Sequence, residues 1–129
     1  TDNIKDMYKF KTPALRNVSL TAPYGHNGAY PTLKGIIKQH LDPTKMNKSW
    51  KPTYANLPNA PWLEQIDFVT FSDKREQDRI ISSIDIKPID LSDKEIYQLV
   101  LFLESLTGKS GNQRPLGKPI KVPSGLTID

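Results

Sequence analysis

The sequence predicts a mainly α-helical fold with long proline-rich loops. Apolar residues recur at helical spacing in residues 32–41, 73–84 and 92–107. Eleven prolines and seven glycines in 129 residues, with a hydrophobic share of only 36%, assign much of the rest to irregular structure. The length suits one domain with a modest core. We therefore divide the chain into a helical body, residues 1–108, and an extended C-terminal arm, residues 109–129.

The first 31 residues show no sustained period and predict an ordered loop. Three prolines, two glycines and an Asn-Gly pair in KTPALRNVSLTAPYGHNGAYPT are typical of defined turns. The same stretch has apolar residues that can anchor it on a core: Leu15, Val18, Leu20, Tyr24 and Tyr30.

The stretch TLKGIIKQHLDP, residues 32–43, predicts a short helix that Pro43 ends, because proline cannot continue the backbone hydrogen bonds. Its apolar face consists of Leu33, Ile36, Ile37 and Leu41. His40 occupies the i+7 position of that face, so it is expected on the buried side. A histidine there is either a core or boundary residue with a satisfied hydrogen bond, or a ligand.

Residues 43–71 are again interrupted by prolines and hold most of the aromatic mass. These aromatic residues can cover a hydrophobic cofactor or plug the side of a helical core: Trp50, Tyr54, Trp62, Phe68 and Phe71. Ser72 is the expected N-cap of a helix over residues 73–84, whose buried stripe is formed by Ile80, Ile81 and Ile84.

The clearest local pattern is LSDKEIYQLVLFLESLTGK. Ser92 and Glu95 have the spacing of a capping box, and Gly108 stands where a left-handed residue commonly ends a helix. From Lys109 the composition changes to glycine, proline and lysine. The arm is either loose or strapped over the body by its apolar residues Leu116, Ile120, Val122 and Leu126.

Composition excludes several classes of function. The net charge is +4, but acidic residues are interspersed with the basic ones and the longest basic run is the pair Lys74-Arg75, which argues against a nucleic-acid patch. The many lysines suit either a plain solvated surface or a docking face for an acidic partner. The chain has no cysteine, so it contains neither a disulfide nor the C-x-x-C-H motif of covalent haem attachment. No stretch is long and apolar enough to span a membrane.

Three ordered blocks carry a family resemblance: FKTPALRNVSLTAPYGHNGAYPTL, then KQHLDP, then LSDKEIYQLVLFLESLTG. Together they resemble the C-terminal part of the bacterial di-haem cytochrome c peroxidases, the family that includes the methylamine-utilisation di-haem enzyme. The match runs from Phe10 to about Gly108, and the final VPSGLTID also resembles the tail of some members.

The resemblance implies that the body is the C-terminal portion of a cytochrome c-like haem domain in a periplasmic oxidoreductase. In the family, an electron-transfer haem feeds a peroxidatic haem that reduces hydrogen peroxide. The haem c would be attached through residues outside this chain. The implied partners are the haem-bearing portion of the same protein and a small electron-donor redox protein. The alternative is a haem-free helical fragment or interaction domain without activity of its own.

The resemblance also assigns individual residues. The family places the distal haem ligand fourteen residues after the histidine of its L-T-x-P-Y-x-H-x-G block, and counting from His26 gives His40. Many members have methionine at this position and the methylamine-utilisation enzyme has tyrosine, but an imidazole also binds haem iron. Met46 and Met7 are the competing ligands, ranked below His40.

Further sites follow from the same blocks. The backbone carbonyls of Thr21 and Pro23 would contribute to a calcium site, which needs six to eight oxygens and so remains incomplete in this chain. Arg16 and Asn17 either pair with a haem propionate or tie their loop to the body. No catalytic residue is assigned, because the family's acid–base glutamate lies in the other haem domain. Whether the chain by itself is an enzyme is left open.

Overall fold

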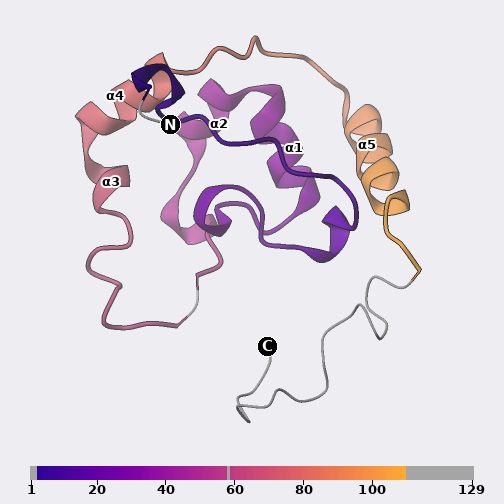
Figure 1. Ribbon diagram of the computed structural model, residues 1–129, viewed down its shortest axis with the longest axis horizontal. Helices are drawn as coiled ribbons and strands as arrows, with labels where there is room; N and C mark the ends of the chain where they lie inside the picture. The colour runs from indigo at the N-terminus through magenta and orange to yellow at the C-terminus, as the bar shows by residue number, and fades with distance from the viewer. Residues whose placement is uncertain (1–2, 58, 110–129) are drawn as a thin grey trace.

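The computed structural model describes residues 3–57 and 59–109, which are mainly helical (Figure 1). The α-helices are α1 (Leu33–Leu41), α2 (Pro43–Ser49), α3 (Val69–Ser72), α4 (Lys74–Ser82) and α5 (Asp93–Ser105). Short 3-10 helices are η1 (Ile4–Asp6), η2 (Val18–Leu20), η3 (His26–Gly28) and η4 (Pro52–Tyr54). Within the described ranges the β-structure is limited to one isolated antiparallel bridge, between Tyr24 and Tyr30. The mainly α prediction is confirmed.

Helix α1 is the centre of the arrangement. It contacts α2, which follows it directly, and α5, which lies far along the sequence and also contacts η2. Helices α3 and α4 pack on each other at the opposite side of the body from α5 (Figure 1). The long loop of residues 10–31 runs beside α1 (Figure 1).

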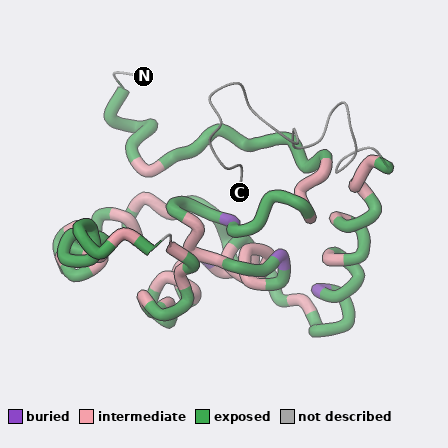
Figure 2. The backbone as a smooth tube through the Cα atoms, turned by 90° about the horizontal axis from the view of Figure 1, so that it is seen from below, coloured by how far each residue is buried: buried purple, intermediate pink, exposed green. Residues whose placement is uncertain are grey.

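The core is small. Among the described residues, the buried hydrophobic side chains are Tyr24, Leu33 and Ile96 (Figure 2). Several large apolar residues are more than half exposed: Ile4, Phe10, Trp62, Ile66, Ile89 and Phe102. Exposed apolar surface on this scale is typical of a body that packs against something else.

Helix α5 begins as the sequence predicts. The Ser92 side chain accepts from the Glu95 backbone N–H, and the Glu95 carboxylate accepts from the Ser92 backbone N–H at 2.8 Å, so the capping box is complete. These hydrogen bonds to Ser92 hold the pKa of Glu95 below its ordinary value. The prediction for Gly108 is wrong. The helix ends at Ser105 with Leu106 as its C-cap, and Gly108 does not have a positive φ; its N–H donates to the Asn17 side chain.

Two other helix predictions need correction. Asp73, rather than Ser72, caps α4, since its carboxylate accepts from the Arg75 backbone N–H; Ser72 ends α3.

Pro43 ends α1 as expected but also begins α2, a helix that was not predicted from the sequence. Asp42 caps α2, and proline is well suited to the first position of a helix, where no N–H is needed. The arm from residue 110 onward lies outside the described residues.

Side-chain contacts hold the N-terminal segment to α4. Tyr8 donates to the Glu76 carboxylate, and Lys9 forms an ion pair of 2.6 Å with Asp85. The hydrogen bond with Asp85 raises the pKa of Lys9, and the same bond lowers the pKa of Asp85. Next along the segment, the Phe10 ring lies 5.0 Å from the ring of His26. Three consecutive residues of this segment, Tyr8, Lys9 and Phe10, therefore contact parts of the chain that are distant in sequence.

Candidate functional site

His40 lies in the last turn of α1. Thr32 caps the start of this helix with its hydroxyl, which accepts from the Gly35 N–H at 3.1 Å, and Leu33 anchors the first turn in the core. The expectation that His40 is buried is wrong, because its side chain is exposed. The ring is hydrogen-bonded to the backbone of α1 itself, and not to a side chain in the core. An exposed ring at a helix end can reach a group outside the chain.

The hydrogen bond of His40 determines which ring nitrogen is free. Nδ1 lies 3.0 Å from the backbone carbonyl oxygen of Ile36. A carbonyl only accepts, so Nδ1 carries the proton of the neutral ring and Nε2 has the lone pair. Histidines that bind metals usually donate their other N–H to a carbonyl or carboxylate, which fixes the ring orientation. In the neutral ring of His40, Nε2 is therefore the nitrogen whose lone pair is not engaged by the Ile36 carbonyl.

Contacts on both sides fix the chain around His40. The Leu41 carbonyl accepts from the backbone N–H of Ile89 at 2.9 Å, which joins the end of α1 to the connection between α4 and α5. The Asp42 carboxylate caps α2 through the Lys45 N–H at 2.9 Å. The ring is thus presented from a turn that is anchored to two other segments.

The competing methionines are placed differently. Met46 is half-buried in the middle of α2, and Met7 is the residue that ends η1, with half of its surface exposed. Met7 belongs to the N-terminal segment, where the neighbouring Tyr8 donates to Glu76 of α4. Neither combines the exposure and the fixed orientation that His40 has.

Asn17 joins the loop to helix α5. Its side-chain oxygen accepts from the Gly108 N–H at 2.7 Å, and its own backbone N–H donates to the Leu106 carbonyl at 3.2 Å. The residue adopts a left-handed conformation, with φ of 58°, which asparagine tolerates better than most residues. Of the two roles predicted for Asn17, the structure contains the tie to the body.

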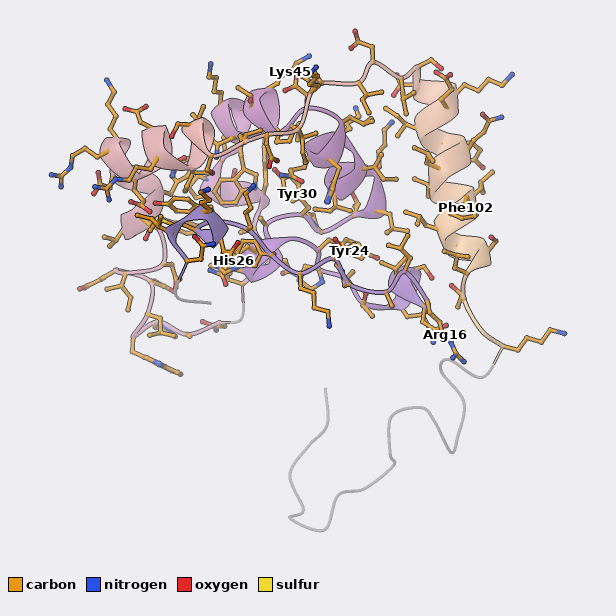
Figure 3. All side chains as sticks on the ribbon, turned by 45° about the horizontal axis from the view of Figure 1, so that its top comes forward. Arg16, Tyr24, His26, Tyr30, Lys45 and Phe102 are labelled. Atoms are coloured by element: carbon orange, nitrogen blue, oxygen red, sulfur yellow. The ribbon has the colours of Figure 1, made fainter. Side chains whose placement is uncertain are left out.

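Arg16 lies beside Asn17 at the foot of α5, and its side chain is exposed (Figure 3). None of the ion pairs among the described residues involves it. Its guanidinium group is therefore available to an anion that this part of the chain does not supply.

Thr21 and Pro23 follow η2 and are both exposed. The Thr21 hydroxyl donates to the Val18 carbonyl at 2.9 Å. Neither the Thr21 nor the Pro23 carbonyl accepts a hydrogen bond from the described residues. Across residues 3–57 and 59–109, no group of three or more His, Cys, Asp or Glu could hold a metal ion. Two free carbonyls are compatible with a partial oxygen site but do not complete one.

A hollow of about 560 Å³ is lined in part by the loop of residues 10–31, including His26. Its aromatic wall consists of Trp50, Phe68 and Phe71, with the Trp50 and Phe71 ring centroids 5.2 Å apart. The Trp50 indole N–H donates to the Ala29 carbonyl at 2.9 Å, which fixes this wall against the loop. The Trp50 ring packs on both Phe68 and Phe71, whereas Tyr54 and Trp62 are exposed. Sequence reasoning missed the hollow, because its lining comes from segments distant in sequence.

His26 and His40 belong to different surroundings. The hollow includes His26 but not His40. Burial raises the pKa of Tyr24 and of Tyr30, which lie on either side of His26 in the loop. The Tyr24 hydroxyl donates to the Val18 carbonyl at 3.0 Å, which joins two parts of the loop that precedes His26.

Comparisons with known proteins give one consistent family. The methylamine utilization protein MauG of Paracoccus denitrificans is 34% identical over 104 residues, which cover 78% of this chain and 23% of that protein. The cytochrome-c peroxidase IdrP1 of Pseudomonas sp. (strain SCT) is 28% identical over 131 aligned residues, covering 94% of this chain and 26% of that protein. The cytochrome c peroxidase Ccp of Escherichia coli is 53% identical over 41 residues, 32% of this chain and 9% of that protein.

The chain spans about a quarter of the length of MauG of Paracoccus denitrificans and of IdrP1 of Pseudomonas sp. (strain SCT). No family model matches the chain, and no solved structure does. The relatives that cover most of the chain are nevertheless all cytochrome c peroxidases or MauG proteins, and the described fold is helical as a cytochrome c-like domain requires. The chain belongs to the di-haem cytochrome c peroxidase family.

Proposed function

We propose that this chain is the C-terminal portion of a haem domain in a peroxide-reducing, periplasmic di-haem oxidoreductase, and that it supplies the distal side of the electron-transfer haem. The names of the relatives support a peroxidase, and the sequence blocks support the C-terminal position. Haem c, attached through cysteines outside this chain, would supply one-electron chemistry there. In the part of the chain that the structure describes, no helix is long and apolar enough to cross a membrane.

The observation that carries the proposal is the geometry of His40. Its Nδ1–H donates to the Ile36 carbonyl, so Nε2 keeps its lone pair and lies on an exposed ring. Because α1 is capped at Thr32 and joined to Ile89 through Leu41, the ring would be held ready before the iron arrives. Replacing the thioether of many relatives by imidazole would stabilise ferric iron and lower the reduction potential.

Arg16 and Asn17 would act together at the edge of the same site. The tie between Asn17 and Gly108 fixes the backbone next to Arg16, whose side chain has no ion-pair partner among the described residues. A guanidinium suits a haem propionate because it offers two parallel donors to a carboxylate. We therefore assign Arg16 to a propionate and Asn17 to positioning the loop.

We also propose a calcium site that uses the free backbone carbonyls of Thr21 and Pro23. Two oxygens are far fewer than calcium requires, so the remaining ligands would come from water and from the other haem domain. The exposed lysines of α2, Lys45 and Lys48, would offer part of a docking face to an acidic electron-donor protein.

The chain without the rest of the protein is expected to turn over no hydrogen peroxide. It has no cysteine for haem attachment and none of the residues that the family uses to cleave peroxide. A purified, haem-free sample should show a rate of peroxide loss equal to that of buffer. Turnover above the buffer rate would place catalytic groups in this chain, contrary to the proposal.

His40→Met in the haem-loaded, complete protein tests the assignment through a reduction potential. Thioether ligation favours ferrous iron more than imidazole does, so the potential of the six-coordinate low-spin haem should rise by on the order of 100 mV or more, within the roughly 0.8 V range that axial ligands set. The peroxidatic haem serves as the internal control and should keep its potential. An unchanged potential at both haems would instead favour the alternative, a helical domain that touches no haem iron.

A further inference from the structure

The hollow at His26 is built from four parts of the chain. Its lining comes from the loop of residues 10–31, the residues that follow α2, the start of α3, and Gln77 of α4. Its volume of about 560 Å³ lies in the range of small-molecule sites. His40 is not among the lining residues. A ligand in this hollow would therefore occupy a place separate from the proposed haem ligand.

The aromatic wall of the hollow is a corner and not a parallel stack. The Phe68 ring is tilted by 47° to the Trp50 ring with centroids 6.2 Å apart, and the Phe71 ring by 67° at 5.2 Å. All three side chains are only half-buried, so part of each ring surface is free of protein contacts. Aromatic ring faces are electron-rich and attract a cation that lies within about 6 Å of the ring centroid.

Contacts within the chain hold this corner in place. The Trp50 indole N–H donates to the Ala29 carbonyl at 2.9 Å, and the Gln77 side chain donates to the Thr70 carbonyl at 3.4 Å. Gly28 has a φ of 68°, and a Cβ atom at this position would lie 2.8 Å from the Pro23 ring, so only glycine fits there without a shift. The hollow therefore exists before a ligand arrives, which lowers the cost of binding.

Asp67 gives the hollow its charge. Among the described residues that line it, Asp67 is the one with a charged side chain, since His26 counts as neutral at pH 7. The lining thus carries one negative charge in a chain whose net charge is +4. Asp67 is exposed and takes part in none of the ion pairs found across residues 3–57 and 59–109. A carboxylate beside three aromatic rings favours a cation and disfavours an anion.

We propose that this hollow is a binding site for an organic ammonium ion. The alkyl groups on the nitrogen pack on the rings of Trp50, Phe68 and Phe71, and the Asp67 carboxylate balances the positive charge. The neutral amides of Asn27 and Asn56, which also line the hollow, offer hydrogen bonds to a polar substituent of the ligand. The proposal does not depend on the haem function proposed above.

Choline is a suitable probe, measured by calorimetry with the complete, haem-loaded protein. We expect a dissociation constant on the order of one millimolar, and binding at least roughly tenfold weaker for the neutral isostere in which carbon replaces the nitrogen. The quaternary nitrogen of choline has no lone pair and cannot bind haem iron. The haem absorption spectrum should therefore stay unchanged, so the outcome is independent of whether His40 is a ligand.

Matched variants locate the site. Asp67→Asn keeps the shape of the side chain but removes its charge, and it should weaken choline binding roughly tenfold. Asp90→Asn removes an equally exposed carboxylate outside the hollow and should leave the affinity unchanged. Phe71→Leu keeps an apolar side chain without an aromatic face. It should weaken the binding of choline several-fold and that of the neutral isostere much less.

Absence of choline binding at concentrations of about ten millimolar would overturn the proposal, because the hollow would then be filled by the rest of the protein or have no affinity for the cation. Equal affinities for choline and its isostere would also overturn it, since the hollow would be a plain apolar site. Equal weakening by Asp67→Asn and Asp90→Asn would place the bound cation outside the hollow, which contradicts the proposal as well.

Discussion

Helices α1 and α5 pack on each other but serve different purposes. Helix α5 carries a complete capping box, buries Ile96 almost fully, and is tied at its end to Asn17. Helix α1 buries Leu33 at its start, while its last turn presents His40 on the surface. The comparison shows a difference within one small body: α5 and the first turn of α1 contribute buried side chains to the core, whereas the last turn of α1 exposes His40, the haem ligand that we propose.

The largest expected loss of stability comes from a change in the buried face of α5. Ile96→Ala removes a side chain that is 5% exposed, and buried isoleucine-to-alanine changes cost about 2–5 kcal/mol. Chemical denaturation of the complete protein should show a lower midpoint of this size. Gln98→Ala, on the exposed side of the same helix, is the matched control and should change stability by less than about 0.5 kcal/mol.

Two substitutions of Asn17 separate the contribution of its hydrogen bond to Gly108 from the strain of its left-handed backbone. Asn17→Ala removes the acceptor for the Gly108 N–H and puts alanine in a left-handed conformation, which together should cost about 1–3 kcal/mol. Asn17→Gly tolerates the conformation but still loses the acceptor, so its loss of stability should be smaller. Equal losses in the two variants would mean that the left-handed conformation contributes nothing.

The cap of α5 has a smaller expected effect. Ser92→Ala removes the side-chain oxygen that accepts from the Glu95 N–H, and losing such an N-cap typically costs about 1 kcal/mol. Thermal unfolding should show this loss, and Ser92→Asp, which keeps an acceptor, should restore most of it. A neutral Ser92→Ala variant would show that tertiary packing alone determines where α5 begins.

The charge on Glu95 makes the same cap sensitive to pH. Hydrogen bonds to Ser92 lower the pKa of Glu95 in the folded chain, so its ionised form stabilises the fold above the ordinary carboxyl pKa. That contribution is lost as the pH falls from about 4.5 through the lower folded pKa. The stability difference between the native protein and Glu95→Gln should therefore be largest at neutral pH and shrink below about pH 4.5. A difference that grows on acidification would contradict this direction.

Local signals in the sequence were sufficient for the scaffold of this comparison. The capping box at Ser92 and the apolar period of residues 32–41 depend on neighbouring residues, so both helices could be predicted. The same logic could have found α2, because Asp42 and Pro43 are an N-cap followed by a favourable first residue. The pattern was instead interpreted only as the end of α1.

Non-local contacts limited the rest. Gly108 was expected to be left-handed, but its N–H is bound by Asn17, 91 residues away in sequence. The exposure of His40 also depends on tertiary packing, because helical periodicity alone places it on the apolar face. The sequence indicated His40 as a candidate ligand on a helix. The hydrogen bond that leaves its Nε2 free could be found only in the structure.

The most direct test of the central claim replaces each of the chain's two histidines in the complete, haem-loaded protein and records the ferric absorption and spin-resonance spectra. With His40→Ala the electron-transfer haem should change from low-spin to high-spin, and added imidazole should restore the low-spin spectrum. With His26→Ala, the matched control in the aromatic hollow, that haem should remain low-spin. A folded His40→Ala protein whose spectra are unchanged would contradict the assignment of His40 as a haem ligand.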